Sequence, residues 1–568
     1  MKDDVKGAKN KTKVLKEKKL LKKVKKDKSS VKKLKTLESD KQADFKKKIA
    51  KVKKLVNQKA GMSNKTHSEI DDDDEDSVIE SDGLEDGEEL VEEDEVEEDE
   101  MEYHIETFTG KELQALNSKD SREEGQETFR WVISPYSEED FFNKFWEKAP
   151  LLIKRNQNDY YKGLFSTKDL DKILREQVVM YSKNLDITSY SDGKRETHNP
   201  IGQAHAPVVW DSYNNGCSIR LLNPQTFHPR VWKCLSMLQE YFNSFCGANV
   251  YLTPPDTQGF APHWDDIEAF ILQMEGKKRW RVYAPRCDDE VLPDYSSPNF
   301  TDDNIGKPIL DTILEPGDLL YFPRGYIHQG HAVEDEHSLH ITISTYQKNS
   351  WGHYLEKLLP QALSLSMSED VEFRRGLPRQ YLDYMGIVHM ERDSEEREAF
   401  KKKVCDLVMR MMENAPFDGC VDQRGSSFIH DCLPPYLTEE DKQCSAYGGG
   451  EKWSPKKKKV VNRVELQPDT LVRLIRGNCI RLVAEEEKVH IYHCLENSRE
   501  YHREEPQFLE IAPENAPAVE ALIHTYPHYV AIESLPLKDE EEKMVIACGL
   551  WERGLLVSSH PLDAQYDD

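Results

Sequence analysis

Two short stretches of the sequence constrain the fold most, because their side chains are predicted to meet in space. His263 and Asp265 are two positions apart in a segment that reads as a β-strand, where alternate side chains share a face. We expect them to converge on one point, with Trp264 facing away. About sixty residues later, the chain from Glu315 to His328 reads as a turn, an apolar strand and a second turn. Two histidines and one carboxylate predict a non-haem Fe(II) site, formed by His263, Asp265 and His328.

Other readings of these residues remain open at this point. A His-x-Asp pair also occurs by chance on surface strands. Three further histidines compete with His328 for the third position: His331, His337 and His340. The P-x-G-x-x-H motif favours His328, because it places this histidine just beyond a rigid turn. His331 has no comparable anchor, and His340 shares its strand face with polar residues, which is typical of a hydrogen-bonded interior or pocket histidine.

Lys278 is the second informative residue. Strand alternation places Lys278, Trp280 and Val282 on one face, so the lysine points into a barrel if the tryptophan does. A buried ammonium needs an anion, and in an Fe(II) oxygenase the natural anion is the distal carboxylate of 2-oxoglutarate. The alternative is an exposed lysine in the turn 277–279. Three strand residues could add hydrogen bonds to this cosubstrate or be ordinary core polarity: Asn249, Tyr251 and Thr342.

Charge divides the beginning of the chain into two blocks. The formal net charge of -27 averages a lysine-dominated start and an almost wholly acidic stretch over residues 71–100. We predict a disordered lysine-rich tail at 1–68 and a disordered acidic segment at 69–110, since neither can bury a core. Lysine clusters are typical of nuclear or nucleolar import and of non-specific contact with nucleic acid.

Cysteine usage and hydropathy indicate the cellular compartment in which the protein is expected. The 11 cysteines are scattered without a C-x-x-C pair, which argues against a secreted disulfide framework or a zinc ribbon. No apolar run is long enough to cross a bilayer, and the start lacks the apolar core of a secretory signal. We expect an intracellular protein without a membrane partner.

From near Phe129 to residue 350, short strands divided by Gly, Pro, Asn and Asp predict a double-sheet barrel. The candidate strands are 150–153, 208–210, 218–222, 249–253 and a half-buried strand at 337–346. Candidate helices are 169–176 and 231–245. The runs 269–274 and 279–283 flank Gly276 and predict a hairpin.

After residue 350 the pattern changes. Residues 354–367 and 396–412 predict helices of an all-α segment that packs between domains or subunits. A charged linker follows at 448–459. The remainder predicts a small α+β unit, with strands at 472–475, 479–483 and 489–492 and helices at 516–524 and 540–555.

The motifs around His263, Lys278 and His328 resemble those of JmjC-type cupins. The longer runs 249–255, 258–270, 315–329, 371–378 and 496–499 are more similar to ribosomal oxygenases of the nucleolar type, which are described as bifunctional lysine demethylases and histidyl-hydroxylases. The resemblance extends from Phe129 to the C-terminus and departs only slightly, at Trp264, where another aromatic residue is common. It implies a mainly β catalytic domain at 125–350 (a double-stranded β-helix of the JmjC/cupin kind), a helical dimerisation segment at 351–430 and a winged-helix-like α+β domain at 431–568.

This resemblance also implies an activity. The cofactors would be Fe(2+), 2-oxoglutarate and O2, with Lys278 holding the cosubstrate and a substrate pocket shaped by Arg220, Tyr251 and Ser344. The expected reactions are hydroxylation of a ribosomal protein histidine and demethylation of histone H3 at its lysines 4 and 36. Such a protein is expected to be a homodimer of the nucleus and nucleolus that acts in transcription regulation and ribosome biogenesis.

The rival hypothesis is a non-enzymatic nucleolar adaptor for chromatin or ribosome assembly, against which the intact ligand set argues. A winged helix usually indicates DNA binding. Acidic clusters at 485–487, 504–505 and 539–542 instead predict that this unit contacts protein.

Overall fold

The computed structural model describes residues 120–448, 450–485, 488–500 and 506–564. The predictions for the lysine-rich tail (1–68) and the acidic segment (69–110) lie outside these residues. The first described helix is α3 (Ser121–Ile133), which starts after its N-cap Asp120 and eight positions before Phe129, the predicted start of the barrel domain. The earlier start follows from this cap, whose side chain accepts a hydrogen bond from the Arg122 amide.

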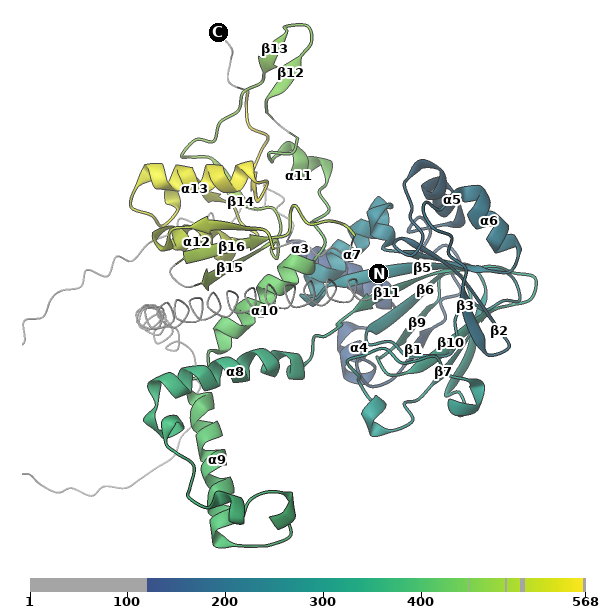
Figure 1. Cartoon of the computed structure of the whole chain (residues 1–568). Helices are drawn as coiled ribbons and strands as arrows, with labels where there is room; N and C mark the ends of the chain where they lie inside the picture. Colours follow the sequence, from purple (N-terminus) through teal and green to yellow (C-terminus); the bar gives the residue numbers. More distant parts are fainter. Residues whose placement is uncertain (1–119, 449, 486–487, 501–505, 565–568) are drawn as a thin grey trace, which may run out of the picture. The chain divides into compact units, whose positions relative to one another are not determined.

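Two antiparallel sheets form the region between residues 151 and 345 (Figure 1). The larger has the strand order β1-β9-β6-β11-β5-β4-β2-β3 and the smaller β10-β7-β8. Their bounds are β1 Leu151–Ile153, β2 Leu185–Ser191, β3 Lys194–Thr197, β4 Ser218–Leu222, β5 Cys246–Thr253, β6 Glu268–Gly276, β7 Lys278–Tyr283, β8 Leu310–Leu314, β9 Leu319–Phe322, β10 Ile327–Ala332 and β11 Ser338–Thr345. Ala269 and Ile271 of the larger sheet pack against Trp280 and Val282 of the smaller one. The predicted double-sheet barrel is confirmed.

The predicted hairpin around Gly276 is wrong, because β6 and β7 belong to different sheets. Strand β6 pairs with β9 and β11, whereas β7 pairs with β8 and β10. Gly276 has φ +61°, and the next residue, Lys277, donates its amide to the carbonyl of His337 at 3.1 Å. The turn therefore carries the chain from one sheet to the other, and Lys278 starts a strand of the second sheet.

Strand β11 is central rather than half-buried, which corrects the prediction for residues 337–346. It pairs with β5 on one side and β6 on the other, and six of its eight residues are buried. Its apolar face, with Ile341 and Ile343, belongs to the main core. Its polar face, with His340, Thr342 and Ser344, lines a cavity. Polar alternation here reflects an internal pocket, which a sequence pattern does not distinguish from solvent.

Helices α3, α4 (Glu138–Lys144) and α7 (Pro229–Phe242) contribute aromatic side chains to the core on the other side of the larger sheet. Phe141 of α4 has its ring centroid 4.9 Å from that of Tyr321 on β9 and 5.8 Å from that of Phe270 on β6. Phe129 of α3 packs edge-on to Phe141 at 5.4 Å. Each buried ring of this kind contributes about 1.5–3 kcal/mol of apolar transfer free energy.

Two further helices of this region are α5 (Thr167–Glu176) and α6 (Ala206–Asn214). The first matches the helix predicted at 169–176, but the second replaces the strand predicted at 208–210. Pro207 stands at its first turn, where a missing amide costs nothing, and only one side of the helix is buried, at Ala206 and Val209. The apolar run V-V-W was too short to separate a helix from a strand.

Beyond the barrel, three helices follow in succession: α8 (Trp351–Glu369), α9 (Glu395–Glu413) and α10 (Phe417–Asp431). Four apolar side chains at four-residue spacing are exposed along α8: Leu355, Leu359, Leu363 and Met367. They form a stripe on one side of the helix, which we call the α8 stripe. Although α8 and α9 have 19 residues each, no helix in the described part of the chain combines the length and hydropathy needed to cross a membrane.

The C-terminal region contains α11 (Glu439–Gln443), α12 (Ala516–Thr525) and α13 (Glu540–Glu552) around small antiparallel sheets. The strands are β12 Lys452–Ser454, β13 Lys459–Val461, β14 Leu471–Leu474, β15 Ile480–Glu485, β16 Lys488–His493, β17 Phe508–Ile511, β18 Val530–Ala531 and β19 Leu556–Ser558. The region has its own apolar core, which agrees with the predicted α+β unit. The linker predicted at 448–459 is instead largely a hairpin of β12 and β13, since Trp453 pairs across to Val460.

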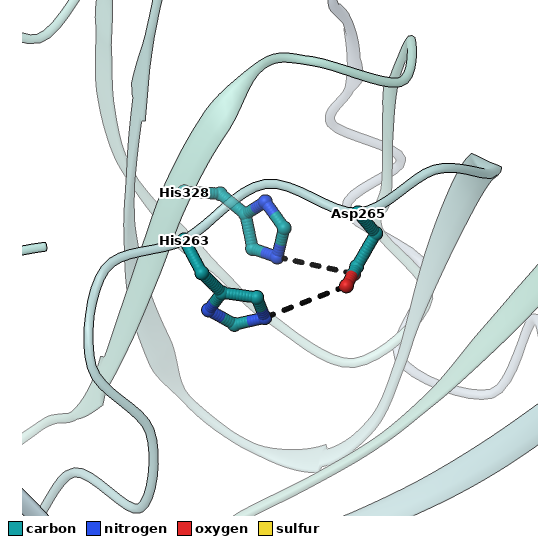
Figure 2. Close-up of side chains that lie close together, drawn as sticks. All are labelled: His263, Asp265 and His328. Atoms are coloured by element: carbon teal, nitrogen blue, oxygen red, sulfur yellow. Dashed lines mark ion pairs between the residues drawn. The ribbon is translucent and has the colours of Figure 1, made fainter. Parts of the chain in front are cut away.

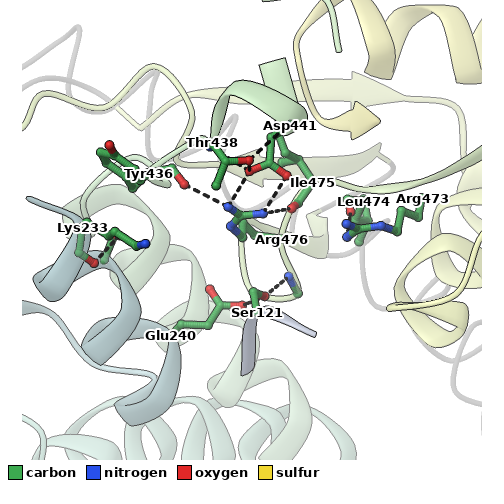
Figure 3. Close-up of polar contacts among 12 residues, drawn as sticks. Ser121, Lys233, Glu240, Tyr436, Thr438, Asp441, Arg473, Leu474, Ile475 and Arg476 are labelled. Carbon is green, nitrogen blue, oxygen red and sulfur yellow. Dashed lines mark hydrogen bonds and ion pairs between the residues drawn. The ribbon is translucent and has the colours of Figure 1, made fainter. Parts of the chain in front are cut away.

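Buried polar contacts join the C-terminal region to α3 and α7 (Figure 3). Glu240 of α7 accepts hydrogen bonds from Ser121 at 2.5 Å and from the amide of Asn478 at 3.1 Å. Tyr526 donates to Ser121 at 2.9 Å. Nearby, the buried guanidinium of Arg476 pairs with Asp441 at 2.9 Å. Each of these donors and acceptors is satisfied, which is what burial of polar groups requires.

Candidate metal centre

His263 lies in the loop between β5 and β6, and its backbone pairs with a single residue, His328 of β10. The His328 amide donates to the His263 carbonyl at 2.9 Å, and the reverse bond measures 3.3 Å. The strand predicted over this segment is therefore wrong, since Pro262 has no amide to extend a ladder. The alternation still holds locally: Trp264 packs in a separate apolar cluster with Tyr283, away from the metal-binding side chains.

Three side chains meet at this bridge (Figure 2). Asp265 places one carboxylate oxygen 3.7 Å from His263 Nε2 and the other 3.7 Å from His328 Nε2. Two metal–ligand bonds of about 2.1 Å can span at most about 4.2 Å, so these separations suit one shared ion. Within the described residues this is the one group of three or more His, Cys, Asp or Glu whose ligand atoms lie close enough together. Two imidazoles and one carboxylate form the donor set that holds non-haem iron.

The two imidazoles are oriented by hydrogen bonds on their far nitrogens. His263 Nδ1 lies 2.8 Å from the carbonyl oxygen of Ala261, and His328 Nδ1 lies 3.1 Å from that of Tyr326. Each carbonyl requires a proton on Nδ1, so each Nε2 has a free lone pair for a cation that lies between it and Asp265. Burial lowers the pKa of His328 to about 4, which keeps this ring neutral and ready to bind a cation.

The turn before His328 is fixed by contacts of Arg324 and Gly325 with other parts of the chain. Gly325 adopts φ +89°, and a Cβ there would lie 2.2 Å from the carbonyl oxygen of Glu290, so another residue does not fit. The Gly325 amide donates to the carbonyl of Asp265 at 3.3 Å. Arg324 is anchored in the core by Glu268 at 2.8 Å. The P-x-G-x-x-H motif therefore couples the position of His328 to the backbone of Asp265.

Lys278 points into the barrel. Its ammonium is buried and donates to Thr253 Oγ1 at 3.0 Å. Gly330 of β10, which pairs with Trp280, makes room for the lysine side chain, because a Cβ there would lie 2.8 Å from Lys278 Cε. Burial without a paired anion lowers the pKa of Lys278 to about 7. The reading of Lys278 as an exposed turn residue is wrong.

One cavity of about 430 Å³ collects the predicted site residues. Lining it are the three candidate ligands, Lys278, the three residues predicted to contact the cosubstrate and the three predicted to shape the substrate pocket: His263, Asp265, His328, Lys278, Asn249, Tyr251, Thr342, Arg220 and Ser344. Tyr251 belongs to both of the last two sets. The fold therefore brings together residues from six separate segments of the chain.

The rival histidines lie elsewhere or act differently. His331 is half-buried and lies 3.1 Å from Asp256, while His337 lies 3.3 Å from Glu275. His340 does line the cavity, stacked on Tyr251 at 4.9 Å. Its Nδ1 is buried without a hydrogen-bond partner, which corrects the prediction of a satisfied histidine.

These observations fit the implied cofactors. The neutral, pre-oriented imidazoles and the carboxylate suit a divalent cation. The unpaired ammonium of Lys278 and the orphaned Nδ1 of His340 lie in the same cavity and suit an anion with oxygen acceptors. A dicarboxylic acid that reaches from the metal to Lys278 would satisfy both.

Four residues of this cavity or its surroundings escaped the sequence analysis: Thr253, Asp186, Arg195 and Phe260. Thr253 is the hydrogen-bond partner of Lys278, and Asp186 is the ion-pair partner of Arg220. Arg195 and Phe260 line the cavity. Arginine, aspartate and threonine on strands carry no local signal, but Phe260, three positions before His263, was near enough to be suspected.

Family models match two parts of the chain. Residues 220–353 match the JmjC domain, and residues 433–562 match the C-terminal winged helix domain of ribosomal oxygenase 1. The first range contains all three candidate metal ligands, and the second lies in the predicted α+β unit. The JmjC and winged-helix predictions are confirmed.

Curated relatives cover most of the chain. Ribosomal oxygenase 1 of Danio rerio is 53% identical over 78% of this chain and 82% of its own length. A bifunctional lysine-specific demethylase and histidyl-hydroxylase NO66 of Branchiostoma floridae is 50% identical over 78% and 69%, respectively. Among solved structures, the Escherichia coli ribosomal oxygenase YcfD covers 74% of this chain and 98% of its own, at 17% identity and a TM-score of 0.39. The chain belongs to the ribosomal oxygenase 1 family and is a 2-oxoglutarate-dependent oxygenase of the JmjC type.

Proposed function

We propose that this oxygenase hydroxylates a histidine of a ribosomal protein. The observation that carries the proposal is the cavity in which His263, Asp265 and His328 lie beside the inward-facing ammonium of Lys278. The relatives named ribosomal oxygenase and histidyl-hydroxylase support the choice of substrate.

The residues of the chain have separate tasks in this reaction. His263, Asp265 and His328 would hold Fe(2+) on one side and leave its other positions open. Lys278, with Thr253, would hold the distal carboxylate of 2-oxoglutarate. Iron and 2-oxoglutarate, when bound, supply the oxidation of a C–H bond by O2 with release of succinate and CO2. The buried walls around Trp280 and Phe322 would keep water from the oxidised carbon.

The charge of the cavity favours histidine over methylated lysine as the residue oxidised. Two guanidinium groups line it, those of Arg195 and Arg220. Its carboxylates are Asp265, a candidate metal ligand, and Asp266, which accepts hydrogen bonds from Ser296 and Gln347. Arg220 is paired with Asp186, but the guanidinium of Arg195 is not compensated. A methylammonium, which is charged at pH 7, would meet this like charge, whereas a histidine is mostly neutral at pH 7.

The decisive experiment incubates the full chain with Fe(2+), 2-oxoglutarate and purified ribosomal proteins. Mass spectrometry should find a gain of one oxygen on a histidine-containing peptide, with succinate formed in equal amount. Asp265→Ala should abolish both products. The proposal fails if the wild type forms no hydroxylated histidine although its metal and 2-oxoglutarate binding are intact.

A second candidate reaction is demethylation of histone H3 lysines at the same site, in chromatin and transcription regulation. The name of the Branchiostoma floridae relative favours it. Methylated peptides covering lysines 4 and 36 of histone H3 test it. Loss of a methyl group with release of formaldehyde supports this activity, and unchanged peptide masses contradict it.

The non-enzymatic adaptor hypothesis is tested by the same mixtures. An adaptor with an inactive barrel would form no succinate with any of these substrates. The intact donor set and the unpaired Lys278 argue for the enzyme, because a barrel without catalysis has no need of either.

We further propose that the protein is a nuclear and nucleolar homodimer involved in ribosome biogenesis. The exposed α8 stripe supports association with a second copy, since monomers rarely expose such a surface. The lysine-rich residues 1–68 support nucleolar import and non-specific contact with nucleic acid. Fluorescence microscopy of the full chain and of a form lacking residues 1–68 tests the import role.

A further inference from the structure

Arg195 is a cation of the cavity that lacks a partner. It lies on β3, the edge strand of the larger sheet, and its side chain is half-buried among the residues that line the cavity. Its Nε is buried without a hydrogen-bond partner, and no described residue forms an ion pair with it. A guanidinium carries five donors and always remains charged, so this arrangement calls for an acceptor from outside the chain.

The orientation of Arg195 is set by an aromatic ring. Its guanidinium lies over Phe260 at 4.4 Å from the ring centroid, and that of Arg220 lies 5.3 Å from the same centroid. The Phe260 ring also contacts Tyr251 edge-on at 5.4 Å. Stacking on an aromatic face holds a guanidinium in place while leaving its in-plane donors free.

The carboxylate whose charge acts on Arg195, that of Asp186, is already used by other residues. Asp186 pairs with Arg220 through Oδ2 and accepts a hydrogen bond from Asn199 at 2.7 Å through Oδ1. Burial and the charge of Arg220 together lower the pKa of Arg195, which shows that its surroundings do not compensate its charge. The charge of Arg220 is therefore compensated within the chain, whereas that of Arg195 is not.

We propose that Arg195 is a substrate-specificity residue, which binds an oxygen acceptor of the peptide next to the residue being oxidised. The acceptor is a main-chain carbonyl or a side-chain carboxylate, because both match the guanidinium donors. This inference rests on the proposed protein substrate and adds a requirement to it. If the acceptor is a carboxylate, peptides that lack one at this position are poor substrates, since they would leave the half-buried arginine unpaired.

The test uses the full chain and the ribosomal-protein peptide that the wild type hydroxylates. Arg195→Met keeps the apolar stem over Phe260 and removes the donors, while Arg195→Lys keeps the charge without the planar fork. The matched control is Lys194→Met, the neighbouring residue of β3, whose side chain is exposed and pairs with Glu196. Arg195→Met should raise the KM for the peptide about 10- to 100-fold. Arg195→Lys should have an intermediate effect, and the control none.

Two readouts separate this role from a merely structural one. The affinity for 2-oxoglutarate and the peptide-independent formation of succinate should be unchanged in Arg195→Met. No hydrogen bond or ion pair joins Arg195 to the candidate metal ligands or to Lys278 among the described residues. The salt dependence identifies the acceptor. A carboxylate makes the wild-type KM rise with KCl more steeply than that of Arg195→Met, whereas a carbonyl gives equal slopes.

An unchanged peptide KM in Arg195→Met overturns the inference while leaving the proposed function intact. An equal loss of 2-oxoglutarate affinity also overturns it, because Arg195 would then support the fold or the cosubstrate site. If the wild type hydroxylates no ribosomal peptide, the proposed function fails first and the inference fails with it.

Discussion

The ammonium of Lys278 lies 3.0 Å from the hydroxyl of Thr253, and no carboxylate among the described residues pairs with it. A charged group is rarely left in this state inside a barrel unless a ligand completes it. The aliphatic stem of the lysine fits against Gly330, so its direction is fixed before any ligand arrives. Pre-organisation of this kind lowers the cost of binding a dicarboxylic acid.

Lys278→Met should weaken 2-oxoglutarate binding about 30-fold or more, because a buried charged hydrogen bond of about 2 kcal/mol or above is lost. Isothermal titration of the Mn(2+)-loaded chain measures the effect. Thr253→Val should weaken binding less, since it removes a hydroxyl but leaves the charge of Lys278 in place. Equal affinities of wild type and Lys278→Met would contradict the assignment.

The affinity for 2-oxoglutarate should fall as the pH rises above about 7. Burial lowers the pKa of Lys278 to about 7 in the empty cavity, and pairing with a carboxylate raises it again. Below about 7 the lysine is already charged, so binding needs no proton. Above it each binding event takes up a proton, and the affinity drops about tenfold per pH unit until the pKa of the bound lysine is reached.

Titrations between pH 6 and 9, in buffers of different ionisation enthalpy, measure both the affinity and the proton uptake. In Lys278→Met this slope should disappear. A slope that persists in the variant would assign the titration to another group.

His328→Ala should reduce the affinity for Fe(2+) by about 100-fold or more, because one of three ligands is lost. The matched control is His331→Ala on the same strand, a half-buried histidine that pairs with Asp256 and should leave metal binding unchanged. Anaerobic titration with Fe(2+) measures both variants. If the control loses the metal and His328→Ala keeps it, the donor set is wrong.

Charging the α8 stripe should separate the proposed dimer. Leu359→Arg combined with Leu363→Arg places two guanidinium groups on an apolar surface, which would have to be desolvated in an interface. Light scattering after size-exclusion chromatography should give the mass of a monomer, against twice that mass for the wild type. Lys357→Glu, an exposed change on the same helix, is the control. A wild type that is already monomeric would refute the proposal.

Arg476→Ala should destabilise the C-terminal region by about 3–5 kcal/mol, because it leaves the carboxylate of Asp441 partly buried without its partner. Urea unfolding followed by tryptophan fluorescence measures the change. Lys442→Ala breaks an exposed pair with Glu439 one residue after Asp441 and should show no measurable loss. Similar midpoints for the two variants would mean that the buried pair is dispensable.

Local sequence patterns gave correct predictions wherever a single helix or strand determines the structure. The alternation of Lys278, Trp280 and Val282 predicted their common inward face, and strand and helix positions were mostly right to within a few residues. These patterns gave wrong predictions where contacts with distant parts of the chain determine the local structure. Residues 208–210 form a helix because only one side of them meets the core. The turn at Gly276 joins two sheets rather than two paired strands, because Lys277 bonds to His337 and not across a hairpin.

The residue types around the candidate metal site, and the rigid turn before His328, were readable in the chain because each motif is short and its residues are near neighbours. The meeting of His263 and Asp265 with His328 was a hypothesis until the backbone bridge between β10 and the preceding loop placed them together. The pairing of Lys278 with Thr253, and the stacking of an unpaired Arg195 on Phe260, left no trace in the sequence. Such contacts join positions far apart in the chain, and only the closed barrel determines which polar side chains face one another without water.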